Sequence, residues 1–296
     1  MGEVVCIKMP SSISSNFDGY NRLINLFSCY QKADVDKIEI DFRANAWFEA
    51  NLLPIVYAYV DYGSRKFKII SVYIYKETSK LHQLFIRNGF AKLCFNMEYQ
   101  PKWHETVVPF KVFRADNTYD FATYIDAEIV RYFPKMENSV MKALSSYIQE
   151  LFGNAQIHGI CDRVFTCGQY YHQNHKMDFT IVNTGVTIGK NVVDYLNEYG
   201  RPLPENNISW AVQPANSTKR TSSGGWGLSL MQEFIFHNNG KYQIISGNEF
   251  WELNCKKNNQ GKLDNFFPGT IINIEIDQSD NAYYRYKRRN DEGNIF

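Results

Sequence analysis

The stretch Ser145–Gly159, SSYIQELFGNAQIHG, carries three polar side chains at intervals of four residues, namely Glu150, Asn154 and His158. Four residues turn an α-helix through about 400°, so these side chains form one slowly drifting stripe along a helix face. Most other positions of the stretch are apolar, which predicts that the rest of this helix is buried. Burying a carboxylate, an amide and an imidazole without partners costs free energy. The stripe therefore predicts either a half-exposed helix or a binding site.

Three further motifs follow this stretch along the chain. A strand ends at Asn183-Thr184-Gly185, a glycine cluster at 224–228 (GGWGL) opens a helix, and a last strand begins at Gly269-Thr270. This order resembles the GHKL superfamily of ATP-binding domains, which includes gyrase B subunits, heat-shock chaperones, histidine kinases and MutL. The resemblance covers residues 138–277 and implies a two-layer α/β sandwich that binds ATP and Mg²⁺.

The resemblance implies a role for each residue of the polar stripe. Glu150 matches the acidic residue that orients or deprotonates the attacking group near the γ-phosphate, so it is the expected catalytic residue. Asn154 matches the residue whose amide oxygen ligates Mg²⁺, a hard cation that prefers oxygen ligands. His158 is expected to support cofactor binding from the same face. Small neighbours, Gly153 and Ala155, leave room for a ligand beside the Asn154 amide.

The base-binding motif of the superfamily reads D-x-G-x-G, and this chain departs from it twice. Asn183 replaces the aspartate that accepts a hydrogen bond from the adenine amino group, and Thr187 replaces the second glycine. The Asn183 amide keeps one acceptor oxygen, which favours adenine, but its donor also leaves guanine open. Gly185 remains where the backbone is expected to approach the base closely.

Residues 189–223 are expected to form a lid over the triphosphate, with a short helix at 208–212. Ser217, Thr218 and Lys219 lie just before the glycine cluster and offer hydroxyls and a cation to phosphate oxygens. The alternative interpretation is an ordinary polar loop.

The glycine cluster matches the phosphate-binding box of the superfamily, with Gly225, Trp226, Gly227 and Leu228 as the matching residues. A helix over 228–236 would present unpaired N–H groups and a positive dipole end to the phosphates. Thr270 matches the last box, at the start of the final strand.

Strands and helices alternate in the first half of the chain, which predicts a small α/β sheet. Strands are expected at 3–9, 37–42 and 67–75, and helices at 16–32, from about 52 to Gly63 and from about 81 to Gly89. The pattern KIEIDF, helix, KIISVYI, helix ending in NGF resembles STAS domains, the fold shared by sulfate transporters and anti-sigma-factor antagonists. Switchable antagonists carry a phosphorylated serine after the first of these strands, but residues 45–52 contain no Ser or Thr. The resemblance therefore implies a docking or dimerisation module.

Two prolines, Pro101 and Pro109, fall in the segment 95–117, where we place the domain boundary. The predicted organisation is a STAS-like α/β domain over 1–115 and a GHKL-type domain with a C-terminal tail over 116–296. The fold class expected for the whole chain is α/β (α+β).

The composition excludes several classes of protein. The net charge of +1 offers no global attraction to nucleic acid, although a basic run, RYKRR, occurs at 285–289. No apolar run approaches the length of a membrane span, and the N-terminus lacks the order of a signal peptide. Six scattered cysteines without a C-x-x-C pair predict free thiols and a cytoplasmic protein, without a zinc site.

Three functions agree with these motifs. We expect a regulatory protein, of bacterial type by the resemblance, that uses Mg-ATP binding and slow hydrolysis to switch its contacts with protein partners. The alternatives are a serine/threonine protein kinase resembling the anti-sigma-factor kinases and a nucleotide-sensing module without turnover. The partner is unidentified, and a homodimer is left open.

Overall fold

The computed structural model describes residues 3–31, 35–65, 69–74, 79–95, 106–218, 227–279 and 282–285. They form a mixed α/β fold, which confirms the predicted class. A small parallel sheet has the order β1 (Glu3–Lys8), β3 (Val35–Asp41), β5 (Ile69–Tyr73), and β2 (Ser12–Ile13) pairs with β4 (Trp47–Phe48). A large antiparallel sheet has the order β6 (Val107–Arg114), β7 (Arg163–Tyr171), β8 (Lys176–Thr184), β10 (Lys257–Asp277), β9 (Lys241–Asn254).

The first edge strand of the large sheet corrects the predicted domain boundary. The sequence placed residues 107–114 in the N-terminal domain, but β6 pairs with β7 from Val107↔Gln169 to Arg114↔Arg163. The boundary at 115/116 is therefore wrong for this strand. Its ladder partner lies far downstream in the sequence, and no local pattern of residues specifies that partner.

The strand β9 folds back on itself at Gly247, where φ is +65°. The Gln243 side chain donates to Glu252 at 2.7 Å, and the Cys255 amide donates to the Gly240 carbonyl at 3.3 Å. The two halves of β9 therefore lie side by side, which agrees with the two short strands expected around 242–245 and 250–253.

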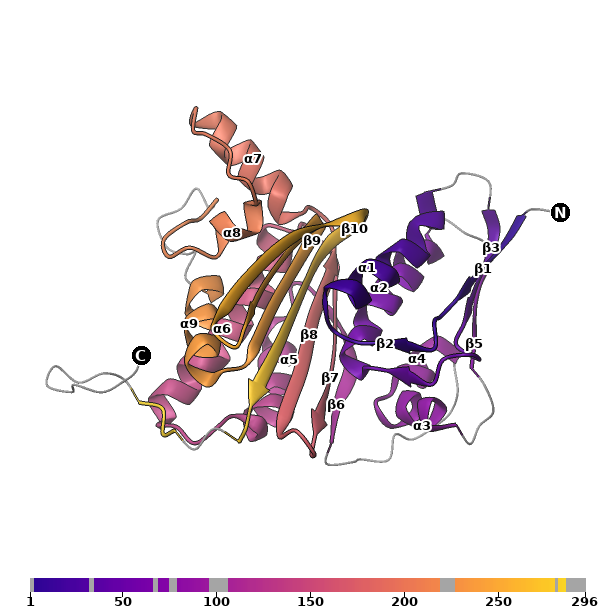
Figure 1. Ribbon diagram of the computed structural model, residues 1–296, viewed down its shortest axis with the longest axis horizontal. Coiled ribbons are helices and arrows are strands. Elements are labelled where there is room, and N and C mark those ends of the chain that lie inside the picture. The colour runs from indigo at the N-terminus through magenta and orange to yellow at the C-terminus, as the bar shows by residue number, and fades with distance from the viewer. Residues whose placement is uncertain are drawn as a thin grey trace, which may run out of the picture.

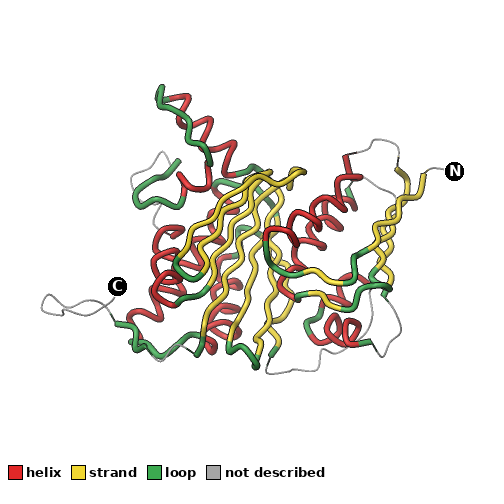
Figure 2. Tube along the Cα trace, in the orientation of Figure 1, coloured by secondary structure: helices red, strands yellow, loops and turns green. Residues whose placement is uncertain are grey.

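Helices cover both faces of the large sheet (Figures 1 and 2). One face carries α5 (Thr118–Tyr124), α6 (Asn138–Ile157) and α9 (Gly227–Asn238). The other face carries α1 (Phe17–Leu26) and α2 (Leu53–Ser64), which lie between the large and small sheets. Two shorter helices, α3 (Lys80–Arg87) and α4 (Phe90–Phe95), lie near one end of the small sheet. The sheet and its first helical face are the two layers expected for residues 116–296. The helices α1 and α2 add a third layer on the other face of the sheet.

The N-terminal elements agree with the predicted alternation. The first expected helix is α1 followed by a 3-10 turn over Phe27–Gln31, and Gly89, at φ +84°, separates α3 from α4. The strand expected at 67–75 is β5, and its predicted ends at 67–68 and 75 lie outside the described residues.

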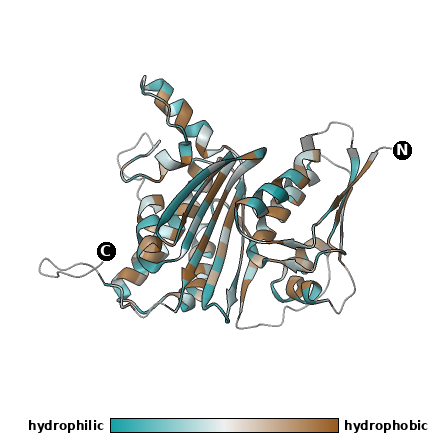
Figure 3. Ribbon diagram, viewed as in Figure 1, coloured by the Kyte–Doolittle hydropathy of each residue, from teal (hydrophilic) through white to brown (hydrophobic). Residues whose placement is uncertain are grey.

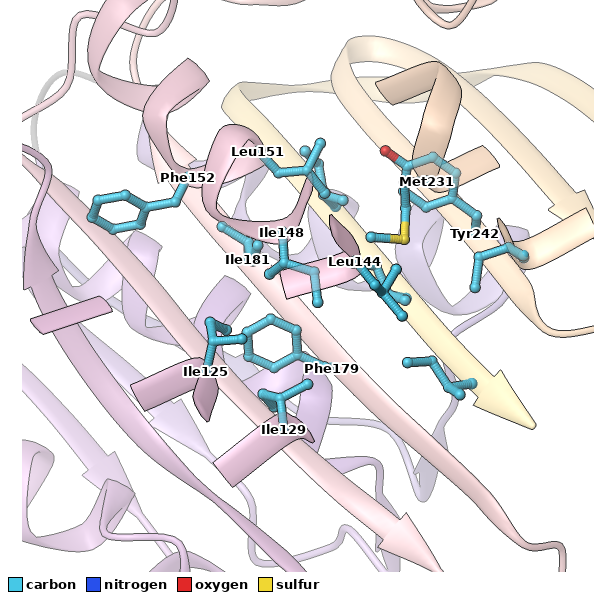
Figure 4. Close-up of a cluster of buried hydrophobic side chains, with 14 of the residues drawn as sticks. Ile125, Ile129, Leu144, Ile148, Leu151, Phe152, Phe179, Ile181, Met231 and Tyr242 are labelled. Carbon is cyan, nitrogen blue, oxygen red and sulfur yellow. The ribbon is translucent and has the colours of Figure 1, made fainter. Parts of the chain in front are cut away.

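The face of the large sheet under α6 is apolar. Met177, Phe179 and Ile181 of β8 point to this face, because side chains alternate along a strand. They pack against α6 residues that include Ile148 and Phe152 (Figure 4). The predicted buried side of the helix is therefore the side that contacts the sheet.

The opposite face of the sheet shares one hydrophobic core with the N-terminal half. Val182 of β8 and Ile271 of β10 belong to the same cluster as Val56 and Tyr59 of α2. The Tyr59 ring stands edge-on to Phe267, with ring centroids 5.6 Å apart. Figure 3 shows hydrophobic residues on α2 and on the strands beside it. The two halves of the chain are consequently packed as one body.

Buried and partly buried polar side chains cross this shared core, and we call them the polar belt: Asp178, Lys241, Gln243, Asn273 and Glu275 from the sheet, with Ser15, Tyr20, Glu49 and Asn51 from the N-terminal half. Asn273 lies at its centre and is fully buried. Its oxygen accepts from Asn51 at 2.9 Å and from Thr180 at 2.7 Å, and its amide donates to Gln243 at 3.0 Å. The belt therefore links three strands of the large sheet to the N-terminal half by hydrogen bonds.

Candidate functional site

A pocket opens at one end of the large sheet, between α6, α9 and the segment that contains α7 (Ile188–Glu198) and α8 (Asn207–Ala211). Much of its wall is apolar, and polar groups stand at separate places around it. Nine residues predicted for the site line this pocket: Glu150, Asn154, His158, Asn183, Ser217, Thr218, Gly227, Leu228 and Thr270. The motifs that were separate in the sequence therefore meet in one cavity.

The polar stripe of α6 forms one wall of the pocket. Glu150, Asn154 and His158 all line it and are partly buried, while Ile148 and Phe152 on the other side of the helix are buried. Of the two interpretations of this stretch, the structure supports a stripe that lines a cavity.

The inner end of the pocket is a row of polar side chains across three strands. Thr270 of β10 stands opposite Asn183 of β8 and opposite Ser246 of β9. The Thr270 and Ser246 hydroxyls are 2.8 Å apart, and Ser246 accepts from the Ile188 amide at 2.8 Å. Ser246 thereby joins the sheet to the first residue of α7.

Asn183 is the member of this row that lacks a partner. Its side chain lines the pocket and is 6% exposed, yet its Nδ2 atom makes no hydrogen bond to the described residues. A buried amide that makes no hydrogen bond costs free energy, and such a group in a native structure calls for an explanation. A polar ligand beside Asn183 would supply that explanation.

The predicted lid contacts α6 through His158. The His158 ring nitrogen Nδ1 and the Thr218 hydroxyl are 3.2 Å apart, and the Asn191 amide of α7 donates to the His158 carbonyl at 2.9 Å. Asn216 also donates to the Trp210 carbonyl at 2.9 Å. His158 therefore holds the lid segment against the pocket in addition to lining it.

The opposite end of the pocket is the start of α9. A Cβ atom added to Gly227 would lie 2.8 Å from Cδ and 2.9 Å from Oε2 of Glu150. The Glu150 side chain therefore packs directly against the first described residue of this helix. Burial, and then the charge of Glu150, raise the pKa of Tyr242, a fully buried residue of β9.

Two residues of the base motif have other roles than the resemblance implied. Gly185 does not line this pocket, and a Cβ atom there would overlap the carbonyl oxygen of Gly159. Thr187 is the N-cap of α7, since its hydroxyl accepts from the Lys190 amide at 3.2 Å. The departure from glycine at 187 thus agrees with the start of a helix.

Three predicted site residues, Lys219, Gly225 and Trp226, lie outside the described residues. Other residues that line the pocket were not predicted, notably Ile188, Asn191, Val192, Trp210 and Asn216. The alternation of apolar and polar residues over 188–198 at helical spacing could have indicated α7.

The comparisons with known proteins give no family for this chain. No protein-family model matches it. No curated protein matches it in sequence either. The arguments for its function therefore rest on the pocket and on the motifs that line it.

The residues of the pocket can contribute only part of a Mg²⁺ site. Within the described ranges, no group of three or more His, Cys, Asp or Glu side chains could hold a metal ion. Asn154 and Glu150 offer oxygen atoms to the pocket, and Mg²⁺ commonly binds one or two protein oxygens together with phosphates and water. The donor set therefore fits an ion that arrives with a nucleotide.

Two general expectations concern the rest of the chain. All six cysteines are unpaired, as predicted. Among the described residues, the structure contains no helix with the length and apolar character needed to cross a bilayer.

Proposed function

We propose that this chain binds a purine nucleoside triphosphate, ATP with Mg²⁺ in the first place, and hydrolyses it slowly to switch its contacts with a protein partner in the cytoplasm. The observation that carries the proposal is the unpaired, buried amide of Asn183 in a largely apolar pocket that ends at the start of α9. A purine base offers flat apolar faces and polar edges, which suit such a pocket.

The two ends of the pocket suit the two ends of a nucleotide. Asn183 and Thr270 offer a donor and acceptors to a base edge, and Trp210 and Ile272 add apolar surface. The N-terminus of α9 favours phosphate, because its amide groups and dipole present partial positive charge there. Mg²⁺, held by phosphate oxygens and by Asn154, would neutralise part of the phosphate charge.

We assign the action on the attacking water to Glu150, because it lines the pocket beside the first described residue of α9. In the proposed hydrolysis, the water oxygen forms a bond to the γ-phosphorus while the bond from that phosphorus to the bridging oxygen breaks. The electron pair of the broken bond stays on ADP, and Glu150 takes the proton from the water.

The N-terminal half argues against phosphorylation of its own STAS-like segment. It favours a switch that operates within one chain. Residues 45–52 contain no Ser or Thr. Ala50, Asn51 and Leu52 are completely buried, and Asn51 donates to Asn273 of the large sheet. This segment is occupied by contacts within the chain, so we expect partners to bind elsewhere on the molecule.

Calorimetric titration of ATP and GTP, with and without Mg²⁺, tests the proposal on the wild type, Asn154→Ala and Asn183→Ala. Binding should require Mg²⁺ and weaken strongly in both variants, while the control Gln156→Ala, an exposed change on α6, should bind as the wild type does. If neither nucleotide binds the wild type, the proposal fails.

The fate of the γ-phosphate separates the three functions predicted from the sequence. Release of free phosphate from labelled ATP would support the ATPase switch, and label on a protein would support a kinase. Tight binding without either product would favour the nucleotide-sensing module.

A further inference from the structure

A second cavity lies where the short helices α3 and α4 of the N-terminal half meet the edge strand β6. Its volume is about 480 Å³, which is within the range of small-molecule sites. Leu93, Pro109 and Phe110 give it an apolar wall. None of the residues that line it also lines the nucleotide pocket. The cavity is therefore a separate place at which this chain can hold a ligand.

The side chain of Asn88 lines this cavity and carries a donor without a partner. Asn88 follows α3 and is 1% exposed. Its Oδ1 atom accepts from the Phe90 amide at 2.9 Å, which settles which end of the side chain is the oxygen. The Nδ2 atom makes no hydrogen bond to the described residues. Because a buried donor without an acceptor costs free energy, this atom favours a ligand that brings acceptor oxygens.

Three positively charged side chains from three elements border the same cavity. Arg87 ends α3, Lys92 belongs to α4 and Lys111 belongs to β6. All three are exposed, and their side chains form no ion pair or hydrogen bond within the described part of the chain. Of the described residues that line the cavity, Glu128 alone carries a carboxylate, and Arg131 pairs with it at 2.9 Å. The cavity therefore has an excess of positive charge.

We propose that this cavity binds a phosphate monoester of a small organic molecule. Such a group carries about two negative charges at pH 7 and several strong acceptor oxygens, so it can accept from Asn88 and from more than one cation. A carboxylate brings less charge and fewer oxygens to the same donors. The apolar wall offers contact surface to the organic part of the ligand. The proposal is independent of the nucleotide pocket.

Calorimetric titration of phenyl phosphate tests the proposal on the wild type, Lys92→Gln and Lys111→Gln. Each variant removes one exposed cation and should fold as the wild type does. The loss of a charged hydrogen bond should weaken binding about 10-fold in each variant. The control Lys142→Gln, an exposed change on α6 outside the cavity, should bind within about twofold of the wild type. Benzoate, which has the same ring and less charge, should bind the wild type more weakly than phenyl phosphate does.

The variant Asn88→Asp tests the buried donor. Aspartate keeps an oxygen for the Phe90 amide but places an anionic oxygen where Nδ2 was, so binding of phenyl phosphate should be lost. Circular dichroism checks that this variant is folded. If it is not folded, the two lysine variants still decide the proposal.

Three results would overturn the proposal. The first is no binding of phenyl phosphate to the wild type, or an affinity that either lysine variant retains. The second is a folded Asn88→Asp that binds as the wild type does. The third is a parallel loss of ATP affinity in the lysine variants, which would place both ligands in one site. We expect their ATP affinity to be unchanged, because neither lysine lines the nucleotide pocket.

Discussion

At the scale of single residues, the glycines next to the pocket differ in what surrounds them. Gly159 and Gly185 are in contact with each other, because an added Cβ at Gly185 would overlap the Gly159 carbonyl. A Cβ at Gly159 would lie 2.7 Å from the Asn183 amide nitrogen. Gly153, on α6, has open space where its side chain would be. These surroundings decide whether a glycine-to-alanine change raises or lowers the free energy of unfolding.

We predict opposite effects on stability for two such changes. Gly153→Ala should raise the free energy of unfolding by about 1 kcal/mol, since alanine favours a helix over glycine by that amount. Gly185→Ala should lower it by about 1–3 kcal/mol, because the backbone near Gly159 must move to admit the methyl group. Urea denaturation of both variants and the wild type checks the pair. A stabilised Gly185→Ala would mean that the contact with Gly159 is loose.

The residues of the pocket show how far a local pattern can predict a site. Glu150, Asn154 and His158 share one helix, so their spacing alone predicts a common face. Asn191 and Trp210 reach the same pocket from α7 and α8, and their positions depend on how those helices pack. The role of Gly185 against Gly159 also could not be predicted, because it depends on a contact between two separate loops.

At the scale of elements, the two faces of the strand β8 differ. One face is apolar and packs against α6, and the other contributes Asp178 to the polar belt. Asp178 is 4% exposed, and the Asn273 side-chain amide donates to its carboxylate at 3.4 Å. Burial raises the pKa of Asp178 to about 7, although the positive charge of Lys241 acts in the opposite direction. Glu275 and Glu49 also face it and favour its neutral form. Lys241 itself is held by Glu275 at 3.2 Å.

We predict that the belt makes stability depend on pH near neutrality. The pKa of Asp178 is higher in the folded chain than in the unfolded chain, so the folded state binds more protons between about pH 4 and 7. The contribution of Asp178 should therefore fall as pH rises through this range, by up to about 1.4 kcal/mol per pH unit. The pKa of Glu275 is lowered, so its own contribution is lost only in acid, below this window.

Chemical denaturation of the wild type and Asp178→Asn from about pH 5 to pH 8 measures this effect. In Asp178→Asn, most of the decrease in stability with rising pH should disappear, since the amide does not ionise. A conserved slope in Asp178→Asn would assign the pH dependence to another group. The control is Asp194→Asn, because Asp194 is exposed on α7 and lies outside the polar belt. Asn88→Asp would be unsuitable, because Asn88 is buried.

Elements were predicted well where one local signal dominates, and poorly where two signals compete. The helix α6, the strand β8 and the helix α9 follow from apolar periodicity and from flanking glycines. The helix α7 was not predicted, because Thr187 was interpreted as a departure from a motif when it is the helix N-cap. The strand β7 was not predicted either, and its pairing with β6 and β8 depends on contacts across the sheet.

At the scale of the whole molecule, both halves of the chain bury apolar side chains against the large sheet. Val182, Ile245 and Ile271 face α1 and α2, and all three are completely buried. Leaving such side chains in water costs about 1.5–3 kcal/mol each. The C-terminal half alone would therefore present an apolar sheet face to solvent.

We predict that a fragment of residues 106–296 aggregates or binds a hydrophobic dye, although it retains all strands of the large sheet. The full chain should unfold in one cooperative transition, because the two halves share a core. Differential scanning calorimetry of the full chain and size-exclusion chromatography of the fragment check both expectations. Two separate transitions in the full chain, with a monomeric fragment, would contradict the shared core.

The packing of α1 and α2 on the large sheet also has a consequence for synthesis on the ribosome. Both helices are complete by Ser64, but the strand β10, which covers them, ends only at Asp277. At roughly 5–20 residues per second, on the order of 10–40 s pass between these two points. During that time the apolar sides of α1 and α2 have no sheet to cover them. The nascent chain is therefore a natural client for chaperones that hold exposed hydrophobic segments until translation is complete.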